Sequence, residues 1–144
     1  MTLRHIMRAM LPLLAIFIMA SCGGPDHKDP ESVAEAALKY YADEDIDGMA
    51  TLLDPADKEK AEGFKQFKDM LEDMKARGIA KASSKEDRPK FEDYTLKRMK
   101  DPYGYDPNKF TNELRVVYDC SKGRDVTVEL VKVNDKWYLN SFPQ

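Results

Sequence analysis

The spacing of apolar residues changes from a helical period to a strand period about halfway along the chain. After Asp29-Pro30, apolar positions recur every three or four residues in three segments, 30–42, 45–53 and 55–77. From Phe91 onward apolar and polar residues alternate, which is the period of a half-buried strand. Helices followed by antiparallel strands predict an α+β fold, with N-terminal helices packed on a curved antiparallel sheet of about four strands.

Capping residues predict where the helices begin and end. Asp29 can cap the first helix, with Pro30 in its first position. Asp45 can cap the second, although Gly48 inside that helix costs about 1 kcal/mol relative to alanine. Gly78 is placed to end the third. The apolar stripes expected to face the core are Val33, Ala37, Tyr40 and Tyr41; Ile46, Met49, Ala50 and Leu53; and Phe64, Phe67, Leu71 and Met74.

The strands are expected in FEDYTLKRM, NELRVVYDC, RDVTVELVKV and WYLNSF. In the second, Leu114, Val116, Tyr118 and Cys120 share one face, and in the third Val126, Val128 and Leu130 do so. Val131 and Val133 have the opposite parity, which predicts a bulge or a change of face near Leu130. The letters NDK between Val133 and Trp137 predict a tight hairpin.

The N-terminus has the parts of a secretory signal peptide. Arg4 and Arg8 precede the apolar run Leu11 to Ala20, and small residues follow it. A membrane-spanning helix needs roughly 20 apolar residues, and this run is about half that length. A basic start, a short apolar run and a small-residue exit therefore predict a segment that is removed on export.

The exit, Met19-Ala20-Ser21-Cys22, resembles the lipobox of bacterial lipoprotein signal peptides. The resemblance implies cleavage before Cys22 and acylation, palmitate included, at that residue. The chain would then be lipid-anchored in the bacterial cell envelope, on the extracytoplasmic side of a membrane. The alternative is an ordinary signal peptide with an incidental cysteine. The expected organisation is a removed signal peptide at 1–21, a tether at 22–29 and a single α+β domain at 30–144.

Net charge and cysteine content limit the classes of binding partner and the possible disulfides. Without Arg4 and Arg8 the basic residues fall from 23 to 21 against 26 acidic ones, so the formal charge moves from -3 to -5. An acidic body argues against nucleic acid as a partner, and membrane attachment would depend on the acyl chains. Because an acylated Cys22 cannot form a disulfide, Cys120 is expected to be a small buried hydrophobe, with a reactive thiol as the alternative.

The order of elements resembles a known superfamily. Three helices, a Tyr-Ala-Asp-Glu-Asp-Ile-Asp-Gly-Met junction and a meander ending in Lys-x-Asn-Asp-Lys-Trp-Tyr-Leu are similar to small exported lipoproteins of unknown function within the nuclear-transport-factor-two-like superfamily. The resemblance implies a cone, a curved sheet wrapped around helices, whose open end often holds a small ligand. By parity and period, the candidate cone-lining residues are Tyr41, Phe67, Tyr94, Tyr118 and Trp137.

These features predict a lipid-anchored binding or interaction protein. Its cone would take a small molecule or peptide, or its sheet would bind another envelope protein. The same scaffold hosts enzymes, binders and interaction domains, so the fold alone assigns no activity. A scaffolding module without a pocket is a further alternative.

One acidic segment nearly matches the calcium loop of an EF-hand. Asp43, Asp45 and Asp47 precede Gly48 at the required spacing, and Asp54 occupies the twelfth position. The twelfth residue is usually the longer Glu, and here Pro55 follows it where an exit helix should continue. The segment also has a helical apolar stripe of its own. We therefore favour an acidic turn between helices, with a calcium-binding module as the alternative and no metal ligand expected.

Catalytic chemistry has few candidates. After removal of the signal peptide, His27 is the one histidine, and it lies in the predicted tether, so a Ser-His-Asp or Cys-His site is not expected. Neither zinc-ligand spacing nor a Gly-rich phosphate loop occurs, so no cofactor is expected. The superfamily resemblance implies one enzymatic alternative, of the ketosteroid-isomerase-like or dehydratase type, which could use Tyr94 or Tyr118 with Asp93 or Asp119. Neighbours in a strand face opposite ways, so a non-catalytic role is the prediction.

Overall fold

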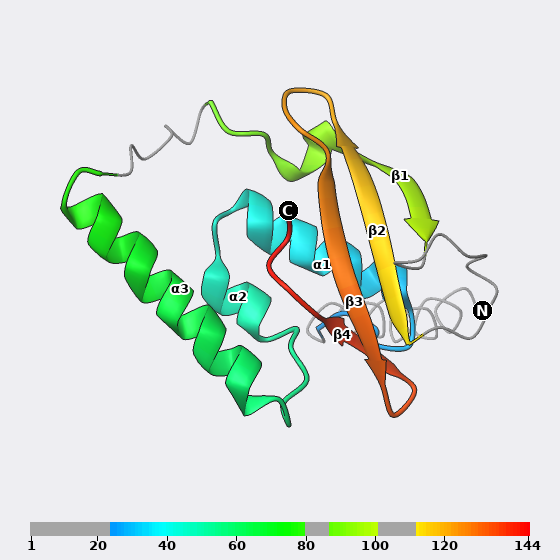
Figure 1. Ribbon diagram of the computed structural model, residues 1–144. Coiled ribbons are helices and arrows are strands. Elements are labelled where there is room, and N and C mark those ends of the chain that lie inside the picture. Colours follow the sequence, from blue (N-terminus) through cyan, green and yellow to red (C-terminus); the bar gives the residue numbers. More distant parts are fainter. Residues whose placement is uncertain (1–23, 80–86, 101–111) are drawn as a thin grey trace, which may run out of the picture.

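The computed structural model describes residues 24–79, 87–100 and 112–144 (Figure 1). The predicted signal peptide and Cys22 lie outside these residues. Three helices, α1 (Pro30–Ala42), α2 (Ile46–Ala50) and α3 (Lys58–Ala76), precede a 3₁₀ turn, η2 (Phe91–Asp93). The strands are β1 (Tyr94–Lys100), β2 (Glu113–Cys120), β3 (Val126–Val133) and β4 (Lys136–Leu139). The α+β prediction is confirmed. None of the described helices is long and apolar enough to cross a bilayer.

The sheet is an antiparallel meander in the order β1-β2-β3-β4. In Figure 1, α1 runs across one face of the sheet, and it contacts β3 and β4. The predicted strand parity holds, because Leu114, Val116 and Tyr118 of β2 are buried on this inner face together with Val126, Val128 and Leu130 of β3. The core therefore lies between α1, α2 and the inner face of β2, β3 and β4.

The bulge predicted near Leu130 is wrong. Residues Val126–Val133 keep an unbroken register with β2 and β4, and Val131 and Val133 lie half-exposed on the outer face. Val131 is directly opposite Tyr138 there, and such a cross-strand pair stabilises an outer face without any change of strand path. The irregularity lies instead in β1, where the register with β2 shifts between Leu96 and Arg98.

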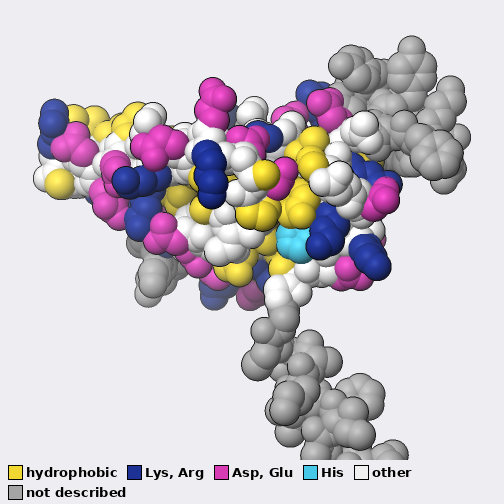
Figure 2. All heavy atoms as spheres, turned by 90° about the horizontal axis from the view of Figure 1, so that it is seen from below, with side chains coloured by type: hydrophobic (Ala, Val, Ile, Leu, Met, Phe, Trp, Pro, Cys, Tyr) yellow, Lys and Arg dark blue, Asp and Glu magenta, His cyan; other side chains and the backbone are white. Residues whose placement is uncertain are grey.

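The segment before α1 lies against the edge of β4. The Trp137 N–H donates to the His27 carbonyl at 2.6 Å, and His27 Nδ1 donates to the Trp137 carbonyl at 2.6 Å. The His27 ring, cyan in Figure 2, also packs on Tyr138 with 4.9 Å between ring centroids. The Leu139 N–H donates to the Leu52 carbonyl at 2.8 Å. The end of the predicted tether is thus bound to the domain, and these contacts cover the outer edge of β4.

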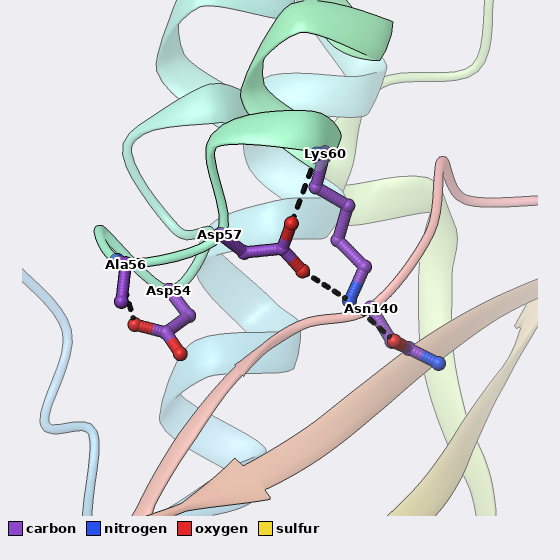
Figure 3. Close-up of polar contacts among 5 residues, drawn as sticks. All are labelled: Asp54, Ala56, Asp57, Lys60 and Asn140. Atoms are coloured by element: carbon purple, nitrogen blue, oxygen red, sulfur yellow. Dashed lines mark hydrogen bonds and ion pairs between the residues drawn. The ribbon is translucent and has the colours of Figure 1, made fainter.

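The predicted caps are confirmed, with one shift in α3. Asp45 Oδ1 accepts from the Gly48 N–H at 2.8 Å, and Gly78 has φ +68° after the end of α3. The third helix was expected from Pro55 but begins at Lys58. The reason is that Asp57 caps it, accepting from the Lys60 N–H at 3.0 Å, as Figure 3 shows.

The last hairpin is confirmed as a two-residue turn. Asn134 and Asp135 both have positive φ, +50° and +61°, between Val133 and Lys136. A tight turn of this kind suits the right-handed twist of two antiparallel strands, and asparagine and aspartate tolerate the left-handed conformation.

Candidate functional site

Helix α3 stands away from the sheet. Of its 19 residues only Phe64 is buried, although the predicted stripe continues along the helix. Phe67, Leu71 and Met74 of that stripe are half-buried. Figure 1 shows α3 on the flank of the molecule beside α2, whereas α1 lies on the sheet. An amphipathic helix usually packs so that its apolar stripe is buried. In α3 much of this stripe stays accessible to solvent.

A cleft of about 820 Å³ separates α3 from the β2–β3 loop. This volume lies within the range of small-molecule sites. The apolar side chains that line it come from all three helices, from the segment before η2, from β1 and β3, and from the C-terminal segment: Tyr41, Ile46, Phe67, Leu71, Pro89, Tyr94, Val126 and Phe142. Charged residues stand on both sides, Lys68, Glu72 and Lys75 on α3 and Lys122, Arg124 and Asp125 on the loop. The cleft has an apolar floor between two charged rims.

The predicted cone-lining residues separate into two groups. Tyr41, Phe67 and Tyr94 line the cleft. Tyr118 and Trp137, only 3% and 8% exposed, belong to the core instead. Tyr118 lies under α1, and burial, with further effects from the acidic groups of α1, raises the pKa of its hydroxyl. That hydroxyl has no hydrogen-bond partner in the described part of the chain.

Phe142, in the segment after β4, connects α3 to the body. The chain after β4 continues along β3, since the Asn140 N–H donates to the Glu129 carbonyl at 2.8 Å and the Gln144 N–H to the Thr127 carbonyl at 3.1 Å. Four residues of this segment therefore span only two of β3, and the extra length carries the Phe142 ring toward α3. Its centroid lies 4.7 Å from that of Phe67, 6.0 Å from Tyr41 and 6.1 Å from Phe64.

Tyr94 and Cys120 are directly opposite each other on β1 and β2. Cys120 is half-buried and free of any disulfide, so it is less buried than the sequence indicated. Burial, with the neighbouring Cys120 thiol, raises the pKa of Tyr94 to about 12. At neutral pH the phenol therefore keeps its proton, and Tyr94 presents the cleft with a neutral aromatic ring.

Glu44 joins two sides of the cleft. Its carboxylate is 2.6 Å from Arg88 Nη1 and 3.3 Å from Lys75 Nζ on α3. Partial burial acts to raise the pKa of Glu44, but hydrogen bonds from Arg88 and Lys75 outweigh it and hold the pKa below 4.5. Its backbone has φ +54°, a conformation that non-glycine residues rarely adopt. The side chain thus stays charged and in place at neutral pH.

The other rim charges are largely paired. Lys68 Nζ is 2.7 Å from Asp47, Lys122 Nζ is 3.3 Å from Asp93, and Asp125 is 3.1 Å from Lys97. A side-chain hydrogen bond from Lys97 holds the pKa of Asp125 below its ordinary value. Arg124 makes no ion pair or hydrogen bond within the described residues, so its guanidinium is available to a ligand.

The acids nominated for enzyme chemistry lie elsewhere. Asp93 accepts from the Lys90 N–H at 2.8 Å, and this bond is the main cause of its lowered pKa. Asp119 is 2.9 Å from Lys97 Nζ. Neither residue lines the cleft, so the structure does not bring these acids together with the cleft tyrosine in one site.

The four aspartates of the EF-hand-like segment make separate contacts and do not converge on one point. Asp43 is the C-cap residue of α1, Asp45 caps α2 and Asp47 pairs with Lys68. Asp54 accepts from the Ala56 N–H at 3.0 Å, as Figure 3 shows. Helix α2 occupies the middle of the segment. Across the described ranges, no three His, Cys, Asp or Glu side chains lie together in a way that could hold a metal ion.

Comparisons of the chain with family models, with curated proteins and with solved structures found no match. The architecture consists of N-terminal helices and a four-stranded antiparallel sheet, with α1 packed on the sheet and a cleft beside α3.

Proposed function

We propose that this protein is a lipid-anchored component of the bacterial cell envelope whose domain binds an amphipathic organic molecule in the cleft beside α3. The cleft itself carries the proposal. Phe67 and Leu71 of α3 face Tyr94 and Val126 of the sheet across a cavity with a volume of about 820 Å³. Filling this space would remove apolar surface from water, at roughly 25 cal/mol for each Å².

The chemistry of the lining narrows the ligand. The floor is aromatic and aliphatic, which favours a ligand with a flat ring system or an acyl chain. Among the described residues Arg124 has no partner, so its cation at the rim can pair with a polar or anionic group at one end of the ligand. Most of the remaining rim charges pair with each other or with neighbouring residues and contribute little net charge.

A binding role is proposed in preference to catalysis. Glu44 and Asp125 are carboxylates of the cleft whose pKa values are lowered, whereas a general acid at neutral pH needs a raised pKa. Tyr94 is protonated at neutral pH. The resemblance to the nuclear-transport-factor-two-like superfamily supports the same site, because a cone open between helices and sheet is where that superfamily often holds a ligand.

The binding site is tested by titrating the fluorescent amphiphile anilinonaphthalene sulfonate into the protein. We expect saturable binding, and we expect Leu71→Gln, on the cleft side of α3, to weaken it about tenfold, which corresponds to roughly 1.4 kcal/mol. Met70→Gln is the matched control, because Met70 is 49% exposed and does not line the cleft. Circular dichroism would establish that both variants are folded. Equal affinity of the two variants would refute the site.

The anchor has its own test. Mass spectrometry of the native protein is expected to show an N-terminal peptide that begins at Cys22 and carries acyl chains. An unmodified peptide that begins elsewhere would refute the proposed anchor but would not affect the proposed binding site.

A further inference from the structure

The N-terminal segment joins the domain at a fixed point. Two hydrogen bonds of 2.6 Å connect His27 to the amide and carbonyl of Trp137, and the His27 ring packs on Tyr138. The turn that contains His27, residues 26–29, is tied to α1, because the Asp26 N–H donates to Ser32 Oγ at 3.1 Å. These contacts, called here the His27 clasp, set the place from which any preceding chain must leave the domain.

The His27 clasp and the cleft lie at opposite ends of the sheet. Trp137 is opposite Lys132, one residue from the end of β3, whereas Val126, which lines the cleft, begins that strand. Six residues of antiparallel strand separate Val126 from Lys132, a distance of about 20 Å. Figure 1 shows the same arrangement, with the β2–β3 loop and the β3–β4 turn at opposite ends of the molecule.

The short chain before the clasp limits how far the domain can move from an anchor. From Cys22 to His27 there are five residues, which span at most about 18 Å when fully extended. We infer that an acylated Cys22 holds the β3–β4 end of the sheet toward the bilayer and the cleft end away from it. The ligand then enters from the aqueous phase and not from the lipid. This inference depends on the proposed anchor and goes beyond the proposed binding site.

The charges near the clasp do not provide a second source of orientation. Figure 2 looks at this end of the molecule and shows basic and acidic side chains intermingled around the histidine. Lys28, Lys132 and Lys136 stand close in sequence or strand register to Asp26, Asp29 and Asp135, so cations and anions balance. The orientation is therefore expected to be the same on neutral and on anionic bilayers.

The test uses the full acylated chain in phosphatidylcholine vesicles that contain lipids with a nitroxide on the headgroup. In a Cys120→Ser background, a fluorophore is attached at Lys136→Cys, beside the β3–β4 turn, or at Ser121→Cys, in the β2–β3 loop. Both residues are exposed, and neither lines the cleft. We expect quenching at position 136 to be several-fold stronger than at 121, with or without 20% phosphatidylserine, since the quencher acts only near the headgroups. Equal quenching, stronger quenching at 121, or a difference that requires the anionic lipid would overturn the orientation.

A lengthened tether is the matched control. Ten Gly and Ser residues inserted between Gly23 and Gly24 would leave the clasp intact but extend the reach, so quenching at 136 should fall toward that at 121. An unchanged difference would contradict the role of the short chain. Flotation of the protein with the vesicles is measured first. A chain that fails to float refutes the anchor and this inference with it, whereas a floating chain with equal quenching refutes the orientation alone.

Discussion

At the scale of single residues, Gly48 has a role that its sequence context did not indicate. In a helix interior glycine is a penalty, and the periodicity predicted a helix in spite of it. In the structure Gly48 is buried against the ring of Tyr40 from α1. A Cβ at this position would lie 2.5 Å from Tyr40 Cε1, closer still to Cδ1, and 2.7 Å from Asp45 Oδ2. The close approach of α2 to α1 therefore requires glycine.

We predict that Gly48→Ala lowers the free energy of unfolding by about 1–3 kcal/mol, because the clash with Tyr40 outweighs the gain in helix propensity. Gly63→Ala is the control, since a Cβ there meets nothing within 4 Å in the same kind of helical position. It should raise stability by about 0.5–1 kcal/mol. Urea unfolding of both variants checks the pair, and a Gly48→Ala protein as stable as Gly63→Ala would contradict the assigned contact.

Glu44 gives a prediction about pH. The folded-state pKa of Glu44 lies below 4.5, so its contribution to stability is fully present above pH 4.5 and is lost as pH falls through the folded pKa. Glu44→Gln, which keeps the side-chain size, should cost about 1 kcal/mol or less at pH 7, a small value because the carboxylate is 48% exposed. The difference from the parent chain should shrink as pH falls below 4.5. Urea unfolding across this range measures it, and a difference that grows as pH falls would reverse the assignment.

At the scale of elements, α3 is held by few contacts. Its first turn is tied to the C-terminal segment by Lys60 Nζ, 2.8 Å from Asn140 Oδ1 (Figure 3). Its middle rests on Phe142, and farther along it depends on ion pairs such as Lys75 with Glu44. Exposed ion pairs each contribute little, so the apolar contacts of Phe64 in the core and of Phe142 provide most of the attachment. An element held in this way opens more readily than the core elements α1, β2 and β3.

We predict that Phe142→Ala destabilises the protein by about 1–3 kcal/mol and speeds amide exchange in α3 more than in α1. Phe142→Leu, which keeps an apolar side chain in contact with α3, should retain most of the protection. Hydrogen exchange resolved by mass spectrometry measures both variants. Uniform acceleration over α1 and α3 would show that Phe142 belongs to the common core.

At the scale of the whole molecule, the edge of the sheet at β4 is covered by the chain itself. His27 and Leu52 pair with the outward backbone groups of Trp137 and Leu139. An uncovered edge strand is a template for pairing with another chain. We therefore expect the N-terminal segment to add to stability and to limit self-association.

This arrangement predicts the effect of a truncation. Compared with the chain 24–144, a chain that starts at Lys28 loses both hydrogen bonds of the clasp, at about 1 kcal/mol each, and exposes the edge of β4. It should be less stable and should self-associate more at high concentration. His27→Ala keeps the backbone carbonyl and should show the smaller loss. Urea unfolding and sedimentation equilibrium compare the three proteins, and an unchanged truncated chain would show that the clasp contributes nothing.

Local patterns were sufficient for most of the fold. The caps Asp29 and Asp45, the Gly78 stop, the strand parity and the Asn134-Asp135 turn each depend on residues close together in sequence, and all were predicted. The start of α3 after its cap Asp57 was not predicted. The predicted bulge near Leu130 was wrong, because parity alone does not tell whether an outer-face valine has a cross-strand neighbour. Val131 finds Tyr138, and the strand stays regular.

The candidate site depended on more than parity. Tyr94 and Tyr118 both point to the inner face of the sheet, as their register with Cys120 and Leu96 requires. Tyr118 is covered by α1 and Tyr94 lies at the open end, so only Tyr94 lines the cleft. Phe142 reaches the cleft through the path of the chain after β4, for which the sequence has no periodic signal.

The amino-acid sequence was enough to predict the order of the elements, most of their ends and the face of each strand that turns inward, because these follow from contacts between near neighbours. Its N-terminus also resembles a signal peptide with a lipobox, and the proposed anchor depends on that resemblance. The tertiary structure decided which aromatic side chains are covered, where α3 leaves an opening and where the N-terminal chain joins the sheet. These depend on which distant segments meet, and periodicity along one element contains no information about the cover that another element provides.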